Sequence, residues 1–182
     1  MNLIPTTFAV VLCVAMASSP CNAAQGFRAN LGGINQVGVP DHVYTLVKFT
    51  NIDFDTSNYY NTATHAWYPP AGLVELQSQV WLNAGAEITV SPTTTFVAKI
   101  VKNATFNRNG KQIDGTAVCT GIGTVGSAPY TAAMNVDCSD LAHTGDYYQV
   151  IVYASAYHGV HGGISTIDGN HMHTFFSGIS IQ

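Results

Sequence analysis

A strict alternation of apolar and polar residues is the feature that most constrains the fold of this chain. The clearest stretch is residues 74–82, where side chains alternate as they do in a half-buried β-strand. Its apolar side consists of Val74, Leu76, Val80 and Leu82, and its polar side of Glu75, Gln77 and Gln79. Because no stretch shows the 3.6-residue period of an amphipathic helix, we predict an all-β protein.

Other segments repeat the alternation. Residues 96–102 do so with Lys99 and Lys102 on the outward side, and residues 147–154 place Tyr148, Val150 and Val152 on one side. Weaker strand candidates are residues 43–49, 115–122, 131–138 and 175–181. Turn sequences separate these runs: Pro69-Pro70-Ala71-Gly72, Asn109-Gly110 and Thr144-Gly145-Asp146. Roughly seven or eight short strands at this spacing predict one antiparallel domain, a β-sandwich or jelly roll over residues 25–182.

Residues 1–24 are predicted to be a signal peptide. An apolar run over residues 8–17 has the length of a secretory h-region, and small residues follow up to Ala24. One alternative is an uncleaved membrane anchor, although a span needs about 20 residues; another is a lipid-modified Cys21. We expect a secreted, periplasmic or cell-surface protein without a membrane span in its mature chain.

Cysteine usage agrees with export. Once the signal peptide is removed, Cys119 and Cys138 remain, with the turn-like residues 123–129 midway between them. A disulfide that closes a loop of about 20 residues contributes about 3 kcal/mol in the chain-entropy model. The alternative is two buried free thiols, one on each strand.

Charge and motif content narrow the function classes. Only 9% of residues are charged, and six scattered Lys and Arg residues do not form the basic face of a nucleic-acid-binding protein. We find no serine elbow, Cys–His pair, paired carboxylates or phosphate-binding loop. We therefore expect a protein that is not an enzyme and has no nucleic-acid partner.

Four of the seven histidines fall within sixteen residues and are candidate metal ligands: His158, His161, His171 and His173. On a strand, the His-x-His spacing of His171 and His173 would place both imidazoles on one side, and His158 or His161 would add a third ligand. Zinc is the first candidate ion. The alternative is a solvated loop or an aromatic-stacking surface. A cupin-type site is excluded, because the nine residues after His173 leave no room for its second ligand motif.

Asp53 and Asp55 suggest a second candidate ion, calcium. They flank Phe54 in the polar segment 51–58, which offers carboxylate and carbonyl oxygens. The segment lacks the spacing of an EF-hand loop. The alternative is a solvated loop held by Asx turns.

The order of several short motifs resembles the globular head of complement C1q, which belongs to the C1q/tumour-necrosis-factor jelly-roll superfamily. The motifs are Gly26-Phe27-Arg28-Ala29-Asn30-Leu31, Phe49-Thr50-Asn51 with Tyr59-Tyr60-Asn61, residues 68–76, Gly145-Asp146-Tyr147-Tyr148-Gln149-Val150 and Thr174-Phe175-Phe176-Ser177-Gly178. They follow the family order over nearly the whole mature chain. The residues before Gly26 contain no collagen-like Gly-X-Y repeat, which argues against the expectation of a complement-type function.

The resemblance implies an antiparallel jelly-roll β-sandwich of two sheets that assembles as a homotrimer and acts by binding. Apolar side chains expected outside the core then become the candidate trimer interface: Trp81, Ile151, Tyr153 and Phe175. The alternative is that both faces of a central strand are covered within one protomer.

The expected ligand surface is a loop-rich end that contains residues 53–61 and 157–173. Its candidate contact residues are Tyr59, Tyr60, Tyr157, His158 and His161. Tyrosine offers a large contact area at little entropic cost, which suits a glycan or protein ligand. A purely structural surface, fibre-head or matrix component is the contrasting hypothesis, and a metal-binding jelly roll is the second alternative.

Overall fold

The computed structural model describes residues 24–83, 95–107, 112–124, 131–155 and 164–181. In that part, thirteen strands and no helix are present. The strands are β1 (Gln25–Asn30), β2 (Gln36–Pro40), β3 (Thr45–Leu46), β4 (Asn51–Asp55), β5 (Tyr60–Asn61), β6 (Ala66–Trp67), β7 (Gly72–Asn83), β8 (Thr95–Phe106), β9 (Gln112–Thr124), β10 (Thr131–Ala142), β11 (Tyr148–Ser155), β12 (Ile164–Ile167) and β13 (Phe175–Ile181). Residues 1–23 of the predicted signal peptide lie outside the described residues.

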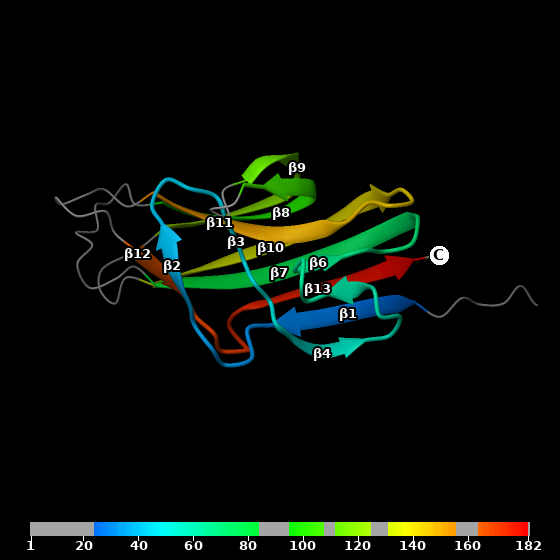
Figure 1. The fold of residues 1–182 in the computed structure, drawn as a ribbon, viewed down its shortest axis with the longest axis horizontal. Coiled ribbons are helices and arrows are strands. Elements are labelled where there is room, and N and C mark those ends of the chain that lie inside the picture. The colour runs from blue at the N-terminus through cyan, green and yellow to red at the C-terminus, as the bar shows by residue number, and fades with distance from the viewer. Residues whose placement is uncertain (1–23, 84–94, 108–111, 125–130, 156–163, 182) are drawn as a thin grey trace, which may run out of the picture.

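The strands form two antiparallel sheets packed against each other (Figure 1). Sheet A has the order β2-β12-β7-β13-β1-β4, with β10 also paired to β7; sheet B has the order β5-β6-β11-β8-β9, with β3 also paired to β11. β1 pairs with β13 along its whole length. The chain changes sheet between β7 and β8, between β9 and β10 and between β10 and β11. The predicted jelly-roll β-sandwich of two sheets is confirmed.

Apolar side chains at alternate positions of the strands form the core between the sheets. In β7, all four residues of the predicted apolar side are buried, whereas Leu73, Glu75 and Gln77 are exposed. This follows from the two-residue period, which sends successive side chains to opposite faces of a sheet. The interpretation of residues 74–82 is therefore confirmed.

An aromatic group fills the centre of the core. The ring of Phe27 on β1 lies 5.1 Å from that of Tyr60, 4.9 Å from Trp67 and 4.9 Å from Phe176, measured between centroids. Offset and edge-to-face contacts at these distances add to the free energy gained by burying apolar area. These four rings join strands of both sheets.

Residues 43–49 form much less strand than expected. Only Thr45 and Leu46 pair as strand, with Val152 and Ile151 of β11. The amide of Val47 still donates to the carbonyl oxygen of Val150 at 2.9 Å, whereas the amide of Lys48 donates to the side chain of Gln36 at 2.8 Å. Strands β9 and β10 are conversely longer than the predicted 115–122 and 131–138.

The outward position predicted for Lys102 is wrong. Lys102 has the same two-residue phase as Ala98 and Ile100, whose side chains are in the core, so alternation along β8 turns it inwards. Val101 is also buried, but in a second cluster apart from this core. The register with β9 shifts here because β9 contains an extra residue, Val118, whereas the pairing of β8 with β11 has no shift up to Lys102. The side chain of Lys102 is consequently only 16% exposed.

A disulfide joins the two sheets at one edge of the sandwich. Cys119 on β9 and Cys138 on β10 are bonded, with their Cα atoms 6.0 Å apart. The predicted disulfide is confirmed, and the alternative of two free thiols is excluded. Over the same described ranges, no helix has both the length and the apolar character needed to cross a bilayer.

Candidate functional site

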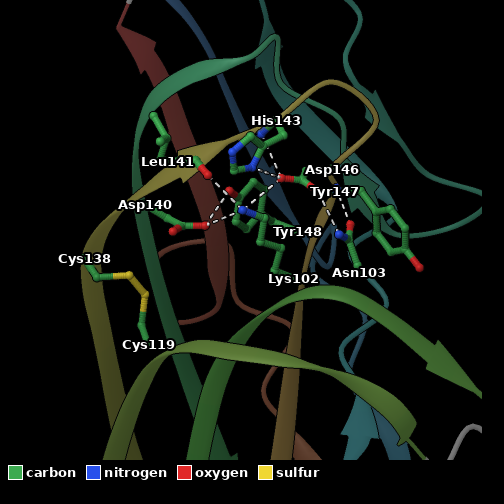
Figure 2. A network of polar contacts seen from close by, with 10 residues as sticks. All are labelled: Lys102, Asn103, Cys119, Cys138, Asp140, Leu141, His143, Asp146, Tyr147 and Tyr148. Atoms are coloured by element: carbon green, nitrogen blue, oxygen red, sulfur yellow. Dashed lines mark hydrogen bonds and ion pairs between the residues drawn. A yellow bond between two sulfur atoms is a disulfide. The ribbon is translucent and has the colours of Figure 1, made fainter.

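A polar network around Lys102 connects β8, the last residues of β10 and the turn before β11 (Figure 2). The ammonium of Lys102 lies 2.8 Å from Asp146 Oδ2 and 3.1 Å from Asp140 Oδ2, and it donates to the carbonyl oxygen of Leu141 at 2.8 Å. Lys102 belongs to sheet B and Asp140 to sheet A. The ion pairs therefore link the two sheets, and we call this network the Lys102 clasp.

The turn before β11 is built around the clasp. The amide of His143 donates to Asp146 Oδ2 at 2.8 Å, and the side-chain amide of Asn103 donates to Asp146 Oδ1 at 2.7 Å. Gly145 has a φ of 90°, which favours glycine because it lacks a Cβ atom. The predicted turn at residues 144–146 is confirmed.

Electrostatics hold the clasp in its charged form. Burial opposes ionisation of Asp146, but hydrogen bonds from Lys102 and Asn103 outweigh burial and lower its pKa. The pKa of Asp140 is lowered in the same way, by Tyr148 and Lys102 against burial. Burial acts to lower the pKa of Lys102, yet the two carboxylates raise it. The Lys102 ammonium forms ion pairs with both carboxylates, and this arrangement suits a structural link between the two sheets.

Replacing Lys102 with methionine should destabilise the fold in a pH-dependent way. At pH 7 we expect a loss of about 2 kcal/mol, between the values for surface and buried ion pairs, because two half-buried carboxylates lose their cation. The lowered pKa values of Asp140 and Asp146 stabilise the wild type above the ordinary carboxyl pKa, and this stabilisation is lost as pH falls through the folded-state values. The difference between wild type and variant should therefore shrink below about pH 4.

Urea denaturation at several pH values measures this difference. Lys99→Met is the matched control, because Lys99 lies on the same strand with its ammonium 4.3 Å from the ring centre of Tyr44, in a cation–π contact rather than an ion pair. Its effect should be at most about 1 kcal/mol and independent of pH in the acid range. A Lys102→Met effect that stays constant from pH 7 to acid would contradict the assignment of the clasp.

The outer face of sheet A gathers exposed apolar side chains. They are Phe54, Leu73, Leu141, Ile179 and Ile181. The pairing register places three of them in one row across the strands, since Leu73 lies opposite both Ile181 and Leu141. We call Leu73, Leu141 and Ile181 the apolar row.

A groove of about 330 Å³ crosses the same face next to the apolar row. Its main lining side chains are Arg28, Phe54, Glu75, Gln77, Asp137 and Ile179, with Ser177 and Gly178 between them. The register explains this set, because Phe54, Arg28, Ser177, Gln77 and Asp137 lie opposite one another on five adjacent strands. We call this site the sheet A groove.

The groove has an excess of negative charge. Arg28 is neutralised by Asp53, with 3.3 Å between Nε and Oδ2, and its guanidinium lies 4.0 Å from the ring centre of Phe175. Glu75 and Asp137 are exposed and have no ion-pair partner among the residues that the structure describes. The described part of the groove thus contains two exposed carboxylates outside any ion pair.

The predicted ligand residues do not form one surface in the described structure. Tyr60 is wrong as a contact residue: it is 6% exposed, packs against Phe27 in the core and donates its hydroxyl to the carbonyl of Phe49. Its burial raises its pKa. Tyr59 is half-buried against the core. Tyr157, His158 and His161 lie outside the described residues.

The two expected ligand segments start from opposite ends of the sandwich. Tyr60 pairs with Trp67, which pairs with Tyr148 at the first residue of β11. The second segment follows Ser155, the last residue of that strand. In Figure 1, β4 runs towards the end that holds the C-terminus, while β12 lies at the other end. The prediction that one loop-rich end holds both segments is therefore wrong for the parts of these segments that the structure describes.

Of the four clustered histidines, the structure describes His171 and His173, and both lie in a turn rather than on a strand. Residues 171–173 precede β13, which begins at Phe175. His171 is exposed; the Nδ1 atom of His173 lies 2.9 Å from Asp168, and its ring stacks on Trp81 at 4.1 Å. Within the described ranges, no cluster of three metal-ligating side chains is found. The set that includes His158 stays a prediction.

The proposed calcium ligands are bound to protein donors. Asp53 pairs with Arg28 and accepts the side-chain amide of Asn30 at 2.6 Å. Asp55 accepts the backbone amides of Ser57 and Tyr60, at 3.2 and 2.7 Å. These contacts favour the Asx-turn alternative.

The candidate trimer residues divide between the two sheets. Ile151 is wrong as an exposed contact, because it is fully buried against Val101 and Ala104 under Tyr44 and Phe106. Tyr153, also in sheet B, is half-buried, with its hydroxyl 2.9 Å from His42 Nδ1.

The other two lie on the outer face of sheet A. Phe175 is 9% exposed beneath Arg28, and Trp81 is half-buried beside His173. For Ile151 and Phe175, the alternative of coverage within one protomer is confirmed.

Comparison with solved structures identifies the architecture. Eiger TNF from S. frugiperda matches with a TM-score of 0.52 and 10% identity, covering 87% of this chain and 92% of that one. The globular domain of zebrafish complement 1qA matches with a TM-score of 0.52 and 10% identity, covering 87% and 96%. The protein has the C1q/TNF jelly-roll fold.

Murine APRIL has the same C1q/TNF fold, with a TM-score of 0.54, 12% identity and coverage of 87% of this chain and 99% of that one. No family model and no curated protein matches the sequence. At these identities the likeness shows the fold alone. The expectation drawn from the motif order is therefore confirmed at the level of the C1q/TNF jelly roll.

The Lys102 clasp and the sheet A groove were missed by sequence reasoning. Glu75 was placed correctly on the polar side of its strand, but its nearness to Asp137 and Phe54 depends on the register of other strands. Gly145-Asp146 was identified as a strand start, which was the available signal for the turn that holds Lys102.

Proposed function

We propose that this protein is an exported, non-enzymatic recognition module that acts as a homotrimer on a protein or glycan ligand. The observation that carries the proposal is the outer face of sheet A. There, Leu73, Leu141 and Ile181 are 45%, 57% and 43% exposed and stand next to one another. Apolar side chains gathered on one face of a soluble domain are typical of an association surface.

Export is supported by two independent features. The Cys119–Cys138 disulfide suits an oxidising compartment, because cytosolic thiols are kept reduced. The sequence pattern of residues 1–24 is that of a secretory signal. The proposal therefore places the protein outside the cytosol, either secreted or at the cell surface.

The trimer contact is assigned to the apolar row. Trp81 stays a candidate member because it lies half-buried on the same face, and Tyr153 would meet a different surface of the neighbouring protomer. Phe175 is left out, because Arg28 covers it within its own protomer. A closed ring buries the same patch on every protomer. The purely structural alternative needs only this contact. The sheet A groove favours recognition, because Glu75 and Asp137 have no ion-pair partner among the described residues.

Light scattering on the purified protein tests the assembly. We expect three times the protomer mass, and we expect Ile181→Glu to raise the dissociation constant at least roughly 100-fold, because the interface would bury an unpaired carboxylate. Ile122→Glu is the matched control, since Ile122 is 67% exposed on sheet B; it should leave the mass unchanged. A wild-type monomer at high concentration would overturn the homotrimer.

A further inference from the structure

We infer that N-glycosylation of Asn103 and the native fold exclude each other. Asn103-Ala104-Thr105 is the one Asn-X-Ser/Thr triplet in this chain, and enzymes that attach sugars to asparagine recognise such triplets. The inference therefore concerns a modification site. It depends on neither the homotrimer nor the ligand of the proposed function.

Both polar atoms of the Asn103 side chain are already bound within the protein. Nδ2 donates to Asp146 Oδ1 at 2.7 Å, and Oδ1 accepts the backbone amide of Tyr147 at 3.0 Å (Figure 2). Because Asp146 and Tyr147 are consecutive residues, both bonds leave the same edge of the planar side-chain amide. Nδ2 therefore donates through the hydrogen that lies beside Oδ1.

That hydrogen is the one that a sugar would replace. In the transfer, a bond forms between Nδ2 and C1 of the sugar, the bond from C1 to the phosphate oxygen of the sugar donor breaks, and Nδ2 releases a proton. The product is a secondary amide, which strongly prefers its two carbon substituents trans. With C1 trans to Cβ, the sugar stands beside Oδ1, where Asp146 lies. A glycan at Asn103 therefore removes the hydrogen bond to Asp146.

The backbone of the triplet is also held in place. The amide of Asn103 donates to the carbonyl oxygen of Tyr147 at 2.9 Å, and the hydroxyl of Tyr147 donates to the carbonyl oxygen of Ala104 at 2.9 Å. Ala104 is buried, and a Cβ atom at Gly115 of β9 would lie 2.5 Å from the Cα atom of Ala104. A transferase must move the triplet out of the sheet to reach Nδ2, so the folded protein should be a poor substrate.

A sugar attached before folding would act against the Lys102 clasp. Asp146 is the carboxylate that lies 2.8 Å from the Lys102 ammonium, and Asn103 is its second side-chain donor. A glycan is bulky and would occupy the space in which the turn at residues 143–147 meets β8. The modified chain should therefore be less stable than the unmodified one.

Asn61 offers a matched site in an exposed turn. Its Oδ1 accepts the backbone amides of Ala63 and Thr64, at 2.8 and 3.4 Å, while its Nδ2 makes no hydrogen bond to the residues that the structure describes. Ala63→Thr completes an Asn-X-Thr triplet there and keeps these backbone amides. Thr105→Ala removes the natural triplet but keeps Asn103 and its contacts, since Thr105 is exposed.

A soluble N-glycosyltransferase with UDP-glucose as sugar donor tests the folded protein, and mass spectrometry counts the sugars. We expect the folded wild type to be modified at least about tenfold more slowly than the Ala63→Thr/Thr105→Ala variant, because Asn103 becomes accessible only through local unfolding. After reduction, and in urea that the enzyme tolerates, both unfolded chains should accept the sugar. A folded wild type that is modified as fast as the variant, or an unfolded wild type that is not modified, would overturn the inference.

Refolding separates the effect of this site from that of a sugar in general. Wild type with glucose on Asn103 should unfold at lower urea concentration than unmodified wild type, or fail to refold. The Ala63→Thr/Thr105→Ala variant with glucose on Asn61 should keep the midpoint of its unmodified form. Equal midpoints for modified and unmodified wild type would contradict the exclusion. Neither measurement involves the assembly or its ligand, so such a result would leave the proposed function intact.

Discussion

Replacing Trp67 with alanine should lower the free energy of unfolding by about 4 kcal/mol. Trp67 is 1% exposed, and its ring lies 4.9 Å from that of Phe27 and 6.2 Å from that of Tyr148. The backbone of sheet A packs directly on it, because a Cβ atom at Gly178 would lie 2.6 Å from Trp67 Cζ3. Truncation therefore leaves a cavity bounded by rigid neighbours, which cannot collapse to fill it.

Chemical denaturation and the melting temperature measure this loss. We expect the melting temperature to fall by about 8–16 °C for a domain of this size. Trp81→Ala is the matched control, because Trp81 is half-buried on the outer face of sheet A, where it stacks on His173. It should cost about 1 kcal/mol, the order expected for an aromatic pair. Equal costs at both positions would contradict the described core.

The second large effect is expected at the disulfide. Replacing Cys119 and Cys138 with serine should lower the free energy of unfolding by about 3 kcal/mol in the chain-entropy model. The bond spans 19 positions of sequence and ties β9 in sheet B to β10 in sheet A. Without it, the unfolded chain gains conformations, and this edge of the sandwich loses its only covalent tie among the described residues.

Denaturation with and without a reducing agent checks the disulfide. The reductant should destabilise the wild type by about the same amount as the double substitution, and it should have no effect on the double variant. Identical denaturation curves for wild type and variant under oxidising conditions would show that the bond contributes nothing to stability.

Local patterns predicted the strands well where one face is core and the other is solvent. The alternation in residues 74–82 gave the buried set of β7 correctly, because the two-residue period acts on each residue without reference to its neighbours in space. The same reasoning was incomplete for β11, since Ile151 on its second face is covered by another part of the same protomer. The outward position predicted for Lys102 was wrong, because Lys102 has the two-residue phase of the buried Ile100 and its side chain points inwards to the carboxylates of the clasp.

Motif order predicted more of the fold than any single motif. The opening and closing motifs, around Phe27 and Phe176, pair as β1 and β13 and bring their rings to 4.9 Å. Adjacent tyrosines illustrate the limit. Tyr59 and Tyr60 were both expected at the surface, although neighbouring residues on extended chain point in opposite directions and Tyr60 turns into the core.

The amino-acid sequence alone determined the all-β class and the two faces of β7, because both follow from local periodicity. It also determined the pairing of Cys119 with Cys138, because these are the two cysteines that remain after the predicted signal peptide. Tertiary structure decided the Lys102 clasp and the sheet A groove. Both join residues that are far apart in the chain, and which of them meet depends on strand order and register. A shift of one residue in register would turn each of these side chains to the other face of its sheet.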